Sequence, residues 1–203
     1  MSKNNNDIFR AVRPNTEIKQ IQLYRHTMRP PGNVPYVVDN LWEWKRPEHY
    51  PNRRYSAFAS PKKEDAILSA GENTIAYRVS FLGNYKLCQV KGNRSFTNNK
   101  DSKYHPDCKI LRSLLLRKLD LSWIDKDIYA KSDIGRLWIP CLRKEEVDTL
   151  FEKTDVLKEI RQDIYDAITY WEDVVLIREG EQIPDQEGEI FFEAFDGYLL
   201  SAV

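Results

Sequence analysis

The sequence contains no apolar run that approaches the roughly 20 residues needed to cross a bilayer. The polar start, Met1–Asn6, lacks the apolar segment of a secretory signal peptide. We therefore expect a cytoplasmic protein that makes no membrane contact, with residues 1–15 as a flexible N-terminus.

The chain also has only three cysteines and three histidines, and its formal net charge is zero. The three cysteines, Cys88, Cys108 and Cys141, are widely separated and lack Cys-x-x-Cys spacing, so we expect reduced, mostly buried thiols. A zinc site built on Cys108 and His105 would lack two ligands, and no metal is predicted. Lys plus Arg and Asp plus Glu both number 31, so bulk charge does not indicate nucleic-acid binding. The distribution is uneven: residues 10–63 are rich in Lys and Arg and residues 145–196 are mostly acidic. This asymmetry would permit a positive cleft beside an acidic lobe.

The common enzyme motifs are missing as well. The chain has no Gly-x-Gly-x-x-Gly fingerprint, Walker loop, His-Glu-x-x-His or Gly-x-Ser-x-Gly. Its three histidines do not exclude a Ser-His-Asp triad, but nothing in the sequence supports one.

The most distinctive segment runs from Asn33 to Tyr55. It holds two Trp, three Tyr, three Pro and three Arg. Proline interrupts it too often for one helix or strand, and its aromatic content is too high for a disordered linker. We predict an ordered binding loop whose rings and guanidinium groups suit a ligand with a flat base and phosphates. The alternative is a Trp/Tyr plug over one edge of the core.

Hydrophobic periodicity predicts strands at both ends of the chain and helices between them. Residues 18–28 alternate, with Arg25 and Ile21 on one face and Tyr24 and His26 on the other. Ser60 followed by Pro61 signals a helix start, and Gly71 a helix end. The predicted strands are 18–28, 55–59, 74–81, 174–177 and 189–200, and the predicted helices are 62–69, 106–119, 144–153 and 155–171. We also expect a short buried piece at 137–140.

These elements predict an α+β fold. The expectation is a single domain, 1–203, with a split, mostly antiparallel sheet formed by strands from both ends of the chain. Residues 91–171 would be a largely helical insertion, with an exposed loop tip at residues 98–101.

Four features follow one another along this framework: Arg25 in the first strand, the aromatic loop, Ser60 after the second strand, and the pair Glu187 and Glu189 before an apolar strand. Together with Leu23–Arg25 and Arg53–Pro61, they resemble the ADP-ribosyltransferase superfamily, and the N-terminal half is similar to RES-type toxins. The resemblance covers residues 21–70 and 187–200. It places the family arginine on Arg25, the serine motif on Phe58–Ser60 and the Glu-x-Glu on Glu187 and Glu189. His26 leaves the histidine-type branch open.

The resemblance implies an NAD-dependent ADP-ribosyltransferase, a toxin or effector of a bacterial or phage conflict system. Its partners would be NAD as substrate, a macromolecular acceptor and a cognate antitoxin. If water were the acceptor, the protein would be an NAD glycohydrolase. The candidate catalytic residues are Glu189, Glu187 and Arg25, and the candidate cofactor-binding residues are Arg25, His26, Asn40, Trp42, Arg53, Arg54, Tyr55 and Ser60.

Elementary chemistry agrees with part of this assignment. Cleavage of the nicotinamide–ribose bond develops positive charge on the ribose, which a carboxylate such as Glu189 can stabilise. An arginine clamps phosphate oxygens bidentately, with Arg25 as the first candidate and Arg53 or Arg54 as the second. Tyr55 or Trp42 could stack on a base.

Each of these residues also has a structural alternative. Arg25 could pair with a carboxylate across a sheet, Ser60 could only cap a helix, and the glutamate pair could belong to a solvated turn. His26 and His49 could be hydrogen-bonded structural histidines. A second hypothesis for the protein is a non-catalytic module whose Trp/Tyr/Arg loop binds a protein or single-stranded nucleic acid by stacking and phosphate contacts.

Overall fold

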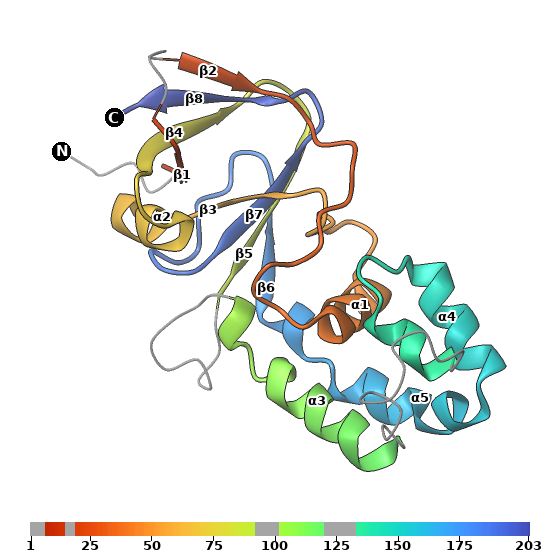
Figure 1. Ribbon diagram of the computed structural model, residues 1–203. Coiled ribbons are helices and arrows are strands. Elements are labelled where there is room, and N and C mark those ends of the chain that lie inside the picture. The colour runs from red at the N-terminus through yellow and green to blue at the C-terminus, as the bar shows by residue number, and fades with distance from the viewer. Residues whose placement is uncertain (1–6, 15–18, 92–101, 120–132) are drawn as a thin grey trace. The chain divides into compact units, whose positions relative to one another are not determined.

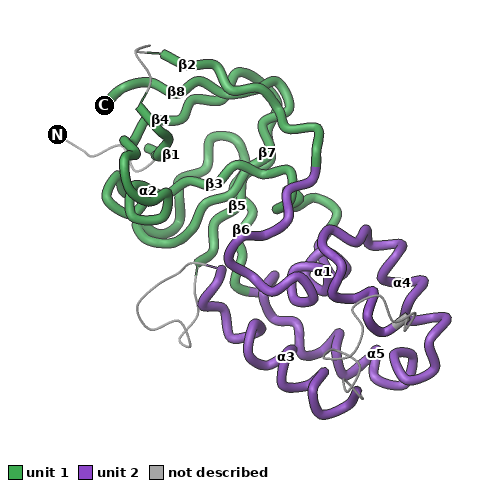
Figure 2. Tube along the Cα trace, viewed as in Figure 1, with its two compact units in different colours: residues 1–27, 48–101, 173–203 green, residues 28–47, 102–172 purple. Residues whose placement is uncertain are grey.

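The computed structural model describes residues 7–14, 19–91, 102–119 and 133–203, and these form an α+β fold (Figure 1). The chain folds into two compact units (Figure 2). Unit 1 combines residues 1–27, 48–101 and 173–203, and unit 2 combines residues 28–47 and 102–172. The predicted fold class is confirmed, since both sheets are antiparallel and unit 1 joins strands from both ends of the chain. Assignment of the whole chain to one ADP-ribosyltransferase-like domain stays a prediction.

Unit 1 contains two four-stranded sheets among its described residues. The first has the order β1-β4-β8-β2, and the second the order β3-β7-β5-β6. The strands of the first are β1 (Phe9–Val12), β4 (Ile75–Phe81), β8 (Tyr198–Ala202) and β2 (Lys19–Gln22). The strands of the second are β3 (Ala57–Ala59), β7 (Ile190–Ala194), β5 (Tyr85–Val90) and β6 (Val174–Ile177).

One hydrophobic cluster joins the two sheets. It includes Tyr77 and Leu200 from the first sheet, and Leu87, Ile190 and Phe192 from the second. Side chains alternate along a strand, so Phe191 and Glu193 lie on the opposite face of β7, and Glu189, which immediately precedes the strand, continues the same alternation.

Helix α2 (Lys63–Ala70) contacts β1 and β4. The predicted helix 62–69 is confirmed, and Gly71 ends it at φ +90°, a conformation that favours glycine. The expected cap at Ser60 is two residues early, because the helix begins at Lys63. The Ser60 hydroxyl still accepts a hydrogen bond from the Lys62 backbone N–H at 3.2 Å.

Unit 2 is helical over the residues described. Its α-helices are α1 (Tyr36–Lys45), α3 (Asp107–Lys118), α4 (Lys144–Lys153) and α5 (Asp155–Ala167). Short 3₁₀ helices lie at η1 (Ser102–Tyr104), η2 (Asp133–Trp138) and η3 (Tyr170–Glu172). The predicted helical insertion is therefore present, and residues 28–47 belong to the same unit. The expected loop tip at 98–101 lies outside the described residues.

The aromatic segment is ordered as predicted, but the prediction of a loop is wrong. Helix α1 lies between Pro35 and Pro47, so proline bounds the helix and does not interrupt it. Trp42 and Trp44 are only 1% and 5% exposed. The Trp42 ring stacks on Tyr170 at 4.0 Å, so these rings fill a core, as the alternative interpretation held.

Three further expectations are corrected. The strand 18–28 shrinks to β2, because Ile21 and Leu23 alternate with polar residues yet stay 65% and 82% exposed and bury no apolar face. The N-terminus expected to be flexible contains β1. The predicted strand 189–200 is two strands, β7 and β8, which belong to different sheets and are joined by a turn that contains Gly197 at φ +85°.

The short piece at 137–140 is buried only in part. Leu137 is fully buried in η2, whereas Ile139 is exposed.

Candidate functional site

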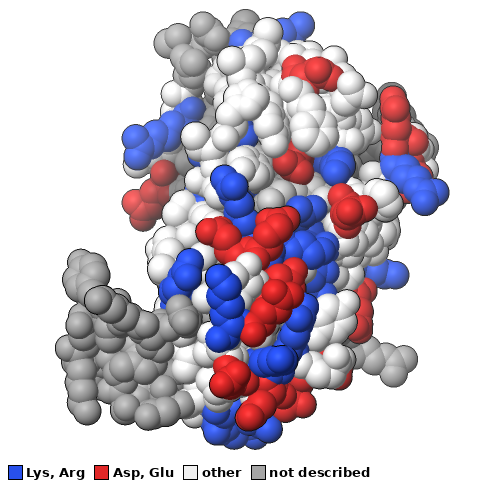
Figure 3. All heavy atoms as spheres, turned by 90° about the vertical axis from the view of Figure 1, so that its right-hand side faces the viewer, with Lys and Arg blue, Asp and Glu red and all other residues white. Residues whose placement is uncertain are grey.

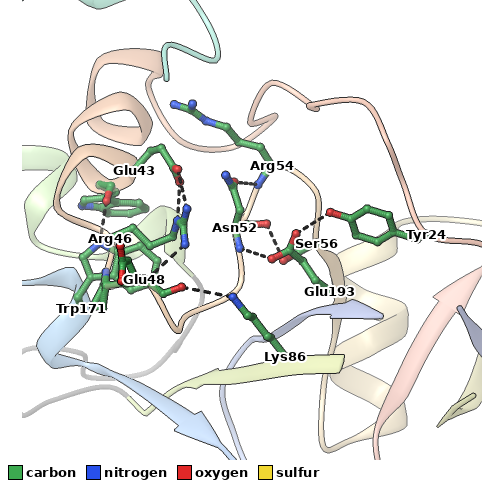
Figure 4. Close-up of polar contacts among 12 residues, drawn as sticks. Tyr24, Glu43, Arg46, Glu48, Asn52, Arg54, Ser56, Lys86, Trp171 and Glu193 are labelled. Carbon is green, nitrogen blue, oxygen red and sulfur yellow. Dashed lines mark hydrogen bonds and ion pairs between the residues drawn. The ribbon is translucent and has the colours of Figure 1, made fainter. Parts of the chain in front are cut away.

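A buried carboxylate, Glu193, gathers polar groups from three separate segments of unit 1 (Figure 4). Its Oε1 accepts a hydrogen bond from the Tyr24 hydroxyl at 2.8 Å, and its Oε2 accepts one from the Asn52 backbone N–H at 2.8 Å. The Ser56 hydroxyl donates to the Asn52 carbonyl at 2.8 Å, and the Asn52 side chain accepts from the Arg54 backbone N–H at 3.0 Å. These bonds fix the turn that brings the Asn52 N–H to the carboxylate.

The aromatic surroundings of Glu193 begin with Tyr24. Its ring stacks on Tyr55 at 6.4 Å, and the rings of His26 and Phe195 lie 5.1 and 5.3 Å away. Burial and the neighbouring Glu193 charge raise the pKa of Tyr24, so the phenol remains a hydrogen-bond donor. The negative charge of Glu193 is therefore held by neutral donors beside an aromatic cluster.

A second cluster lies four residues earlier on the same face of β7. Arg53 Nη1 is 2.8 Å from Glu189 Oε1, with the two side chains 7% and 12% exposed. The Arg53 guanidinium also stands over the rings of Phe58 and Phe191, at 5.0 and 5.2 Å. Phe58 and Phe191 are register partners in the β3–β7 ladder, so the Arg53 guanidinium packs on two neighbouring rings of the sheet.

The remaining acidic candidate, Glu187, lies at the surface. It pairs with Lys62 at 2.9 Å, which raises the pKa of that lysine. Ser60 follows the last β3–β7 register pair, Ala59 and Ile190, and its backbone pairs with Phe9 of β1. Of the predicted site residues, Arg53 and Glu189 are in direct contact, whereas Ser60 bonds to Phe9 and Lys62.

The structure separates other predicted residues from this region or changes their setting. Arg25 and His26 are exposed and follow β2, so Arg25 is not a strand residue as predicted. Arg54 is buried and Tyr55 is half-buried.

The two candidates on α1 belong to the core of unit 2. Asn40 is fully buried and donates to the carbonyls of Leu137 and Ile139, at 2.8 and 2.7 Å. Trp42 donates its indole N–H to Asp107 at 2.9 Å. Neither position fits the predicted cofactor-binding role, because these polar groups are committed to internal partners.

Glu193 is the residue that the sequence interpretation missed. Its signal was weak but present, since a glutamate inside the apolar run Ile190–Phe195 is unusual and lies on the same strand face as Glu189. Four residues of strand span about 13 Å, more than the separation over which two carboxylates flank one glycosidic bond. Glu189 and Glu193 therefore belong to two different centres.

The described residues include no group of three or more His, Cys, Asp or Glu side chains arranged to hold a metal. The conceivable zinc pair has other contacts: His105 Nδ1 is 3.3 Å from Asp107, and the Cys108 thiol donates to the Ser102 carbonyl at 3.8 Å.

The comparisons with known proteins give no relative. No family model, curated protein or solved structure matches the chain. Across the described ranges, no helix is both long and apolar enough to span a membrane.

Proposed function

We propose that the protein cleaves NAD and transfers ADP-ribose to a macromolecular acceptor, at a centre around Glu193. The proposal rests on the burial of the Glu193 carboxylate and on its hydrogen-bond partners. Glu193 is 6% exposed, and its hydrogen-bond partners among the described residues, Tyr24 and Asn52, are neutral. A negative charge without a cationic partner is the group that a developing ribosyl cation requires.

Glu189 fits this role less well than expected. Its charge is offset by Arg53 at 2.8 Å, in a setting where both side chains are almost fully buried. We therefore move the ribose-facing role from Glu189 to Glu193 and give Glu189 the task of holding Arg53. Glu187, exposed beside Lys62, is left for contact with the acceptor.

In the proposed reaction, the bond between nicotinamide and ribose breaks, and nicotinamide leaves with the bonding electrons. Positive charge develops on the ribose, where the Glu193 carboxylate stabilises it. A ribose hydroxyl that displaces the Tyr24 phenol would find the same acceptor oxygen, since Tyr24 bonds Glu193 at 2.8 Å. A nucleophile of the acceptor then bonds to the ribose carbon and releases its proton.

Two neighbours of Tyr24 complete the proposed site. Arg25 is exposed, so its guanidinium can clamp the NAD pyrophosphate, whereas Arg53 is committed to Glu189. His26 and Tyr55 flank the Tyr24 ring and offer surfaces for a base. With water as the acceptor, the same centre would act as an NAD glycohydrolase. We place the activity in the cytoplasm, in a toxin or effector restrained by a cognate antitoxin.

The experiment that tests this proposal measures nicotinamide release from NAD, with and without a cell extract as the source of acceptor. The wild type should release nicotinamide, and Glu193→Gln should be slower by about 100-fold or more, the scale of losing one key electrostatic stabiliser. The matched control is Glu152→Gln, an exposed residue on α4 that should retain wild-type activity.

Product analysis distinguishes the acceptors. ADP-ribose attached to a macromolecule supports transfer, and free ADP-ribose supports hydrolysis. No release under either condition would reject NAD chemistry and favour a binding module, although burial of Trp42 and Trp44 removes the aromatic surface on which that module was predicted.

A further inference from the structure

Unit 2 contains a pocket of about 410 Å³ that the proposed NAD chemistry does not use. It lies among α1, α4 and α5, and its lining includes Lys45, Lys144, Asp148, Arg161 and Tyr165. The volume is in the range of sites for small molecules. Figure 3 shows one face of the molecule, on which Lys and Arg side chains are interleaved with Asp and Glu.

The only carboxylate of this lining is already satisfied. Asp148 Oδ1 accepts a hydrogen bond from the Trp44 indole at 2.7 Å and pairs with Arg161 Nη2 at 2.8 Å. Arg161 also lies over the Trp44 ring at 5.6 Å, which fixes the guanidinium plane. Asp148 therefore serves to hold Arg161 in place and not to bind a cation.

Lys45, which also lines the pocket, is held in place by several contacts. Its ammonium donates to the carbonyls of Tyr165 and Ile168, at 2.8 and 2.7 Å, and stands 4.4 Å from the centre of the Tyr165 ring. Those carbonyls lie at the C-terminal end of α5, where a cation is favoured. Two N–H groups of the ammonium are used and the third is left for a ligand.

Lys144 contributes a charge that the fold itself does not need. It lies in the first turn of α4, the end of a helix at which a cation is unfavourable, and among the described residues it has no ion-pair partner. The Tyr165 hydroxyl likewise has no hydrogen-bond partner within the described ranges. The pocket thus offers three cations and a phenol as donors, against one carboxylate that Arg161 neutralises.

We propose that this pocket binds a small phosphomonoester. A phosphate group presents several acceptor oxygens and a double negative charge, which match the donors of Lys45, Lys144, Arg161 and Tyr165. The limited volume favours a sugar- or glycerol-sized ester over a polymer backbone. This site is independent of the proposed NAD centre, because every residue involved belongs to unit 2.

The test uses the full chain and two matched ligand pairs, glucose 6-phosphate with glucose and glycerol 3-phosphate with glycerol. Binding is measured by calorimetry and thermal shift at low salt, where electrostatic attraction is least screened. At least one ester should bind and its parent alcohol should not. Lys144→Glu should weaken that binding at least tenfold, and its fold should hold because an acid in the first turn suits the helix.

The control is Lys153→Glu, which makes the same charge change in the last turn of α4, outside the pocket, and should bind within twofold of the wild type. Equal binding of ester and alcohol, an equal loss in both variants, or no binding of either ester would each overturn the proposal. Binding of a single-stranded 20-nucleotide DNA without either ester would also overturn it, in favour of a polyanionic partner.

Discussion

The Arg53–Glu189 ion pair provides the sharpest prediction about stability. The two atoms are 2.8 Å apart, and the side chains are 7% and 12% exposed. Arg53→Met removes the guanidinium that stands over Phe58 and Phe191 and takes away the positive charge that faces the buried Glu189 carboxylate. Breaking a buried pair from one side costs about 3–5 kcal/mol, so we expect each of Arg53→Met and Glu189→Gln to lose an amount of that order.

The double variant Arg53→Met/Glu189→Gln removes both charges together. Because no orphaned charge remains, its loss should be smaller than the sum of the single losses by about 2 kcal/mol. Urea unfolding followed by tryptophan fluorescence measures all four free energies of unfolding. If the loss of stability in the double variant equals the sum of the two single losses to within about 0.5 kcal/mol, these residues do not stabilise the fold as a pair.

Three further predictions address other parts of the molecule. Gly197→Ala should lower the free energy of unfolding by about 2 kcal/mol or more in urea unfolding, because Gly197 has φ +85° and an added Cβ would lie 2.7 Å from the Gln22 carbonyl; an unchanged stability would contradict the geometry of the turn between β7 and β8. Burial opposes ionisation of Asp107, but hydrogen bonds from His105, Thr169 and Trp42 hold its pKa below the usual value, so its stabilising effect is present above the unfolded pKa of about 3.9 and is lost as the pH falls further. Asp107→Asn should therefore be less stable at pH 7 and should show a shallower loss of stability below about pH 4 in acid titration, and an identical acid profile would contradict this network. Arg25→Ala should weaken NAD binding at least tenfold in calorimetry while unfolding within about 0.5 kcal/mol of the wild type, whereas a large loss of stability would make Arg25 a structural residue.

The elements that the sequence predicted well are those with one apolar face against a core. The bounds of α4 match the prediction, because Val147, Leu150 and Phe151 recur at helical spacing and are buried. Periodicity overextended the first predicted strand: only Lys19–Gln22 forms a strand, and beyond it Leu23 stays exposed and buries no apolar face. In the segment 33–55 the prolines were counted as breaks, although their positions leave ten residues free for α1.

The candidate site was recovered only in part, because its geometry depends on long-range pairs. Arg53 and Glu189 were both selected from the sequence, but their mutual contact joins positions 136 residues apart. Glu193 was missed since the apolar residues around it suggested only a buried strand. The turn at Asn52 depends on hydrogen bonds with Arg54 and Ser56, which composition alone does not reveal.

The central claim is that Glu193 stabilises charge on the ribose during NAD cleavage. The most direct measurement compares NAD affinity with single-turnover nicotinamide release in the wild type and in Glu193→Gln. A group needed only as charge develops should leave the dissociation constant within about threefold and lower the cleavage rate by about 100-fold or more. Equal cleavage rates in the two proteins would contradict the account.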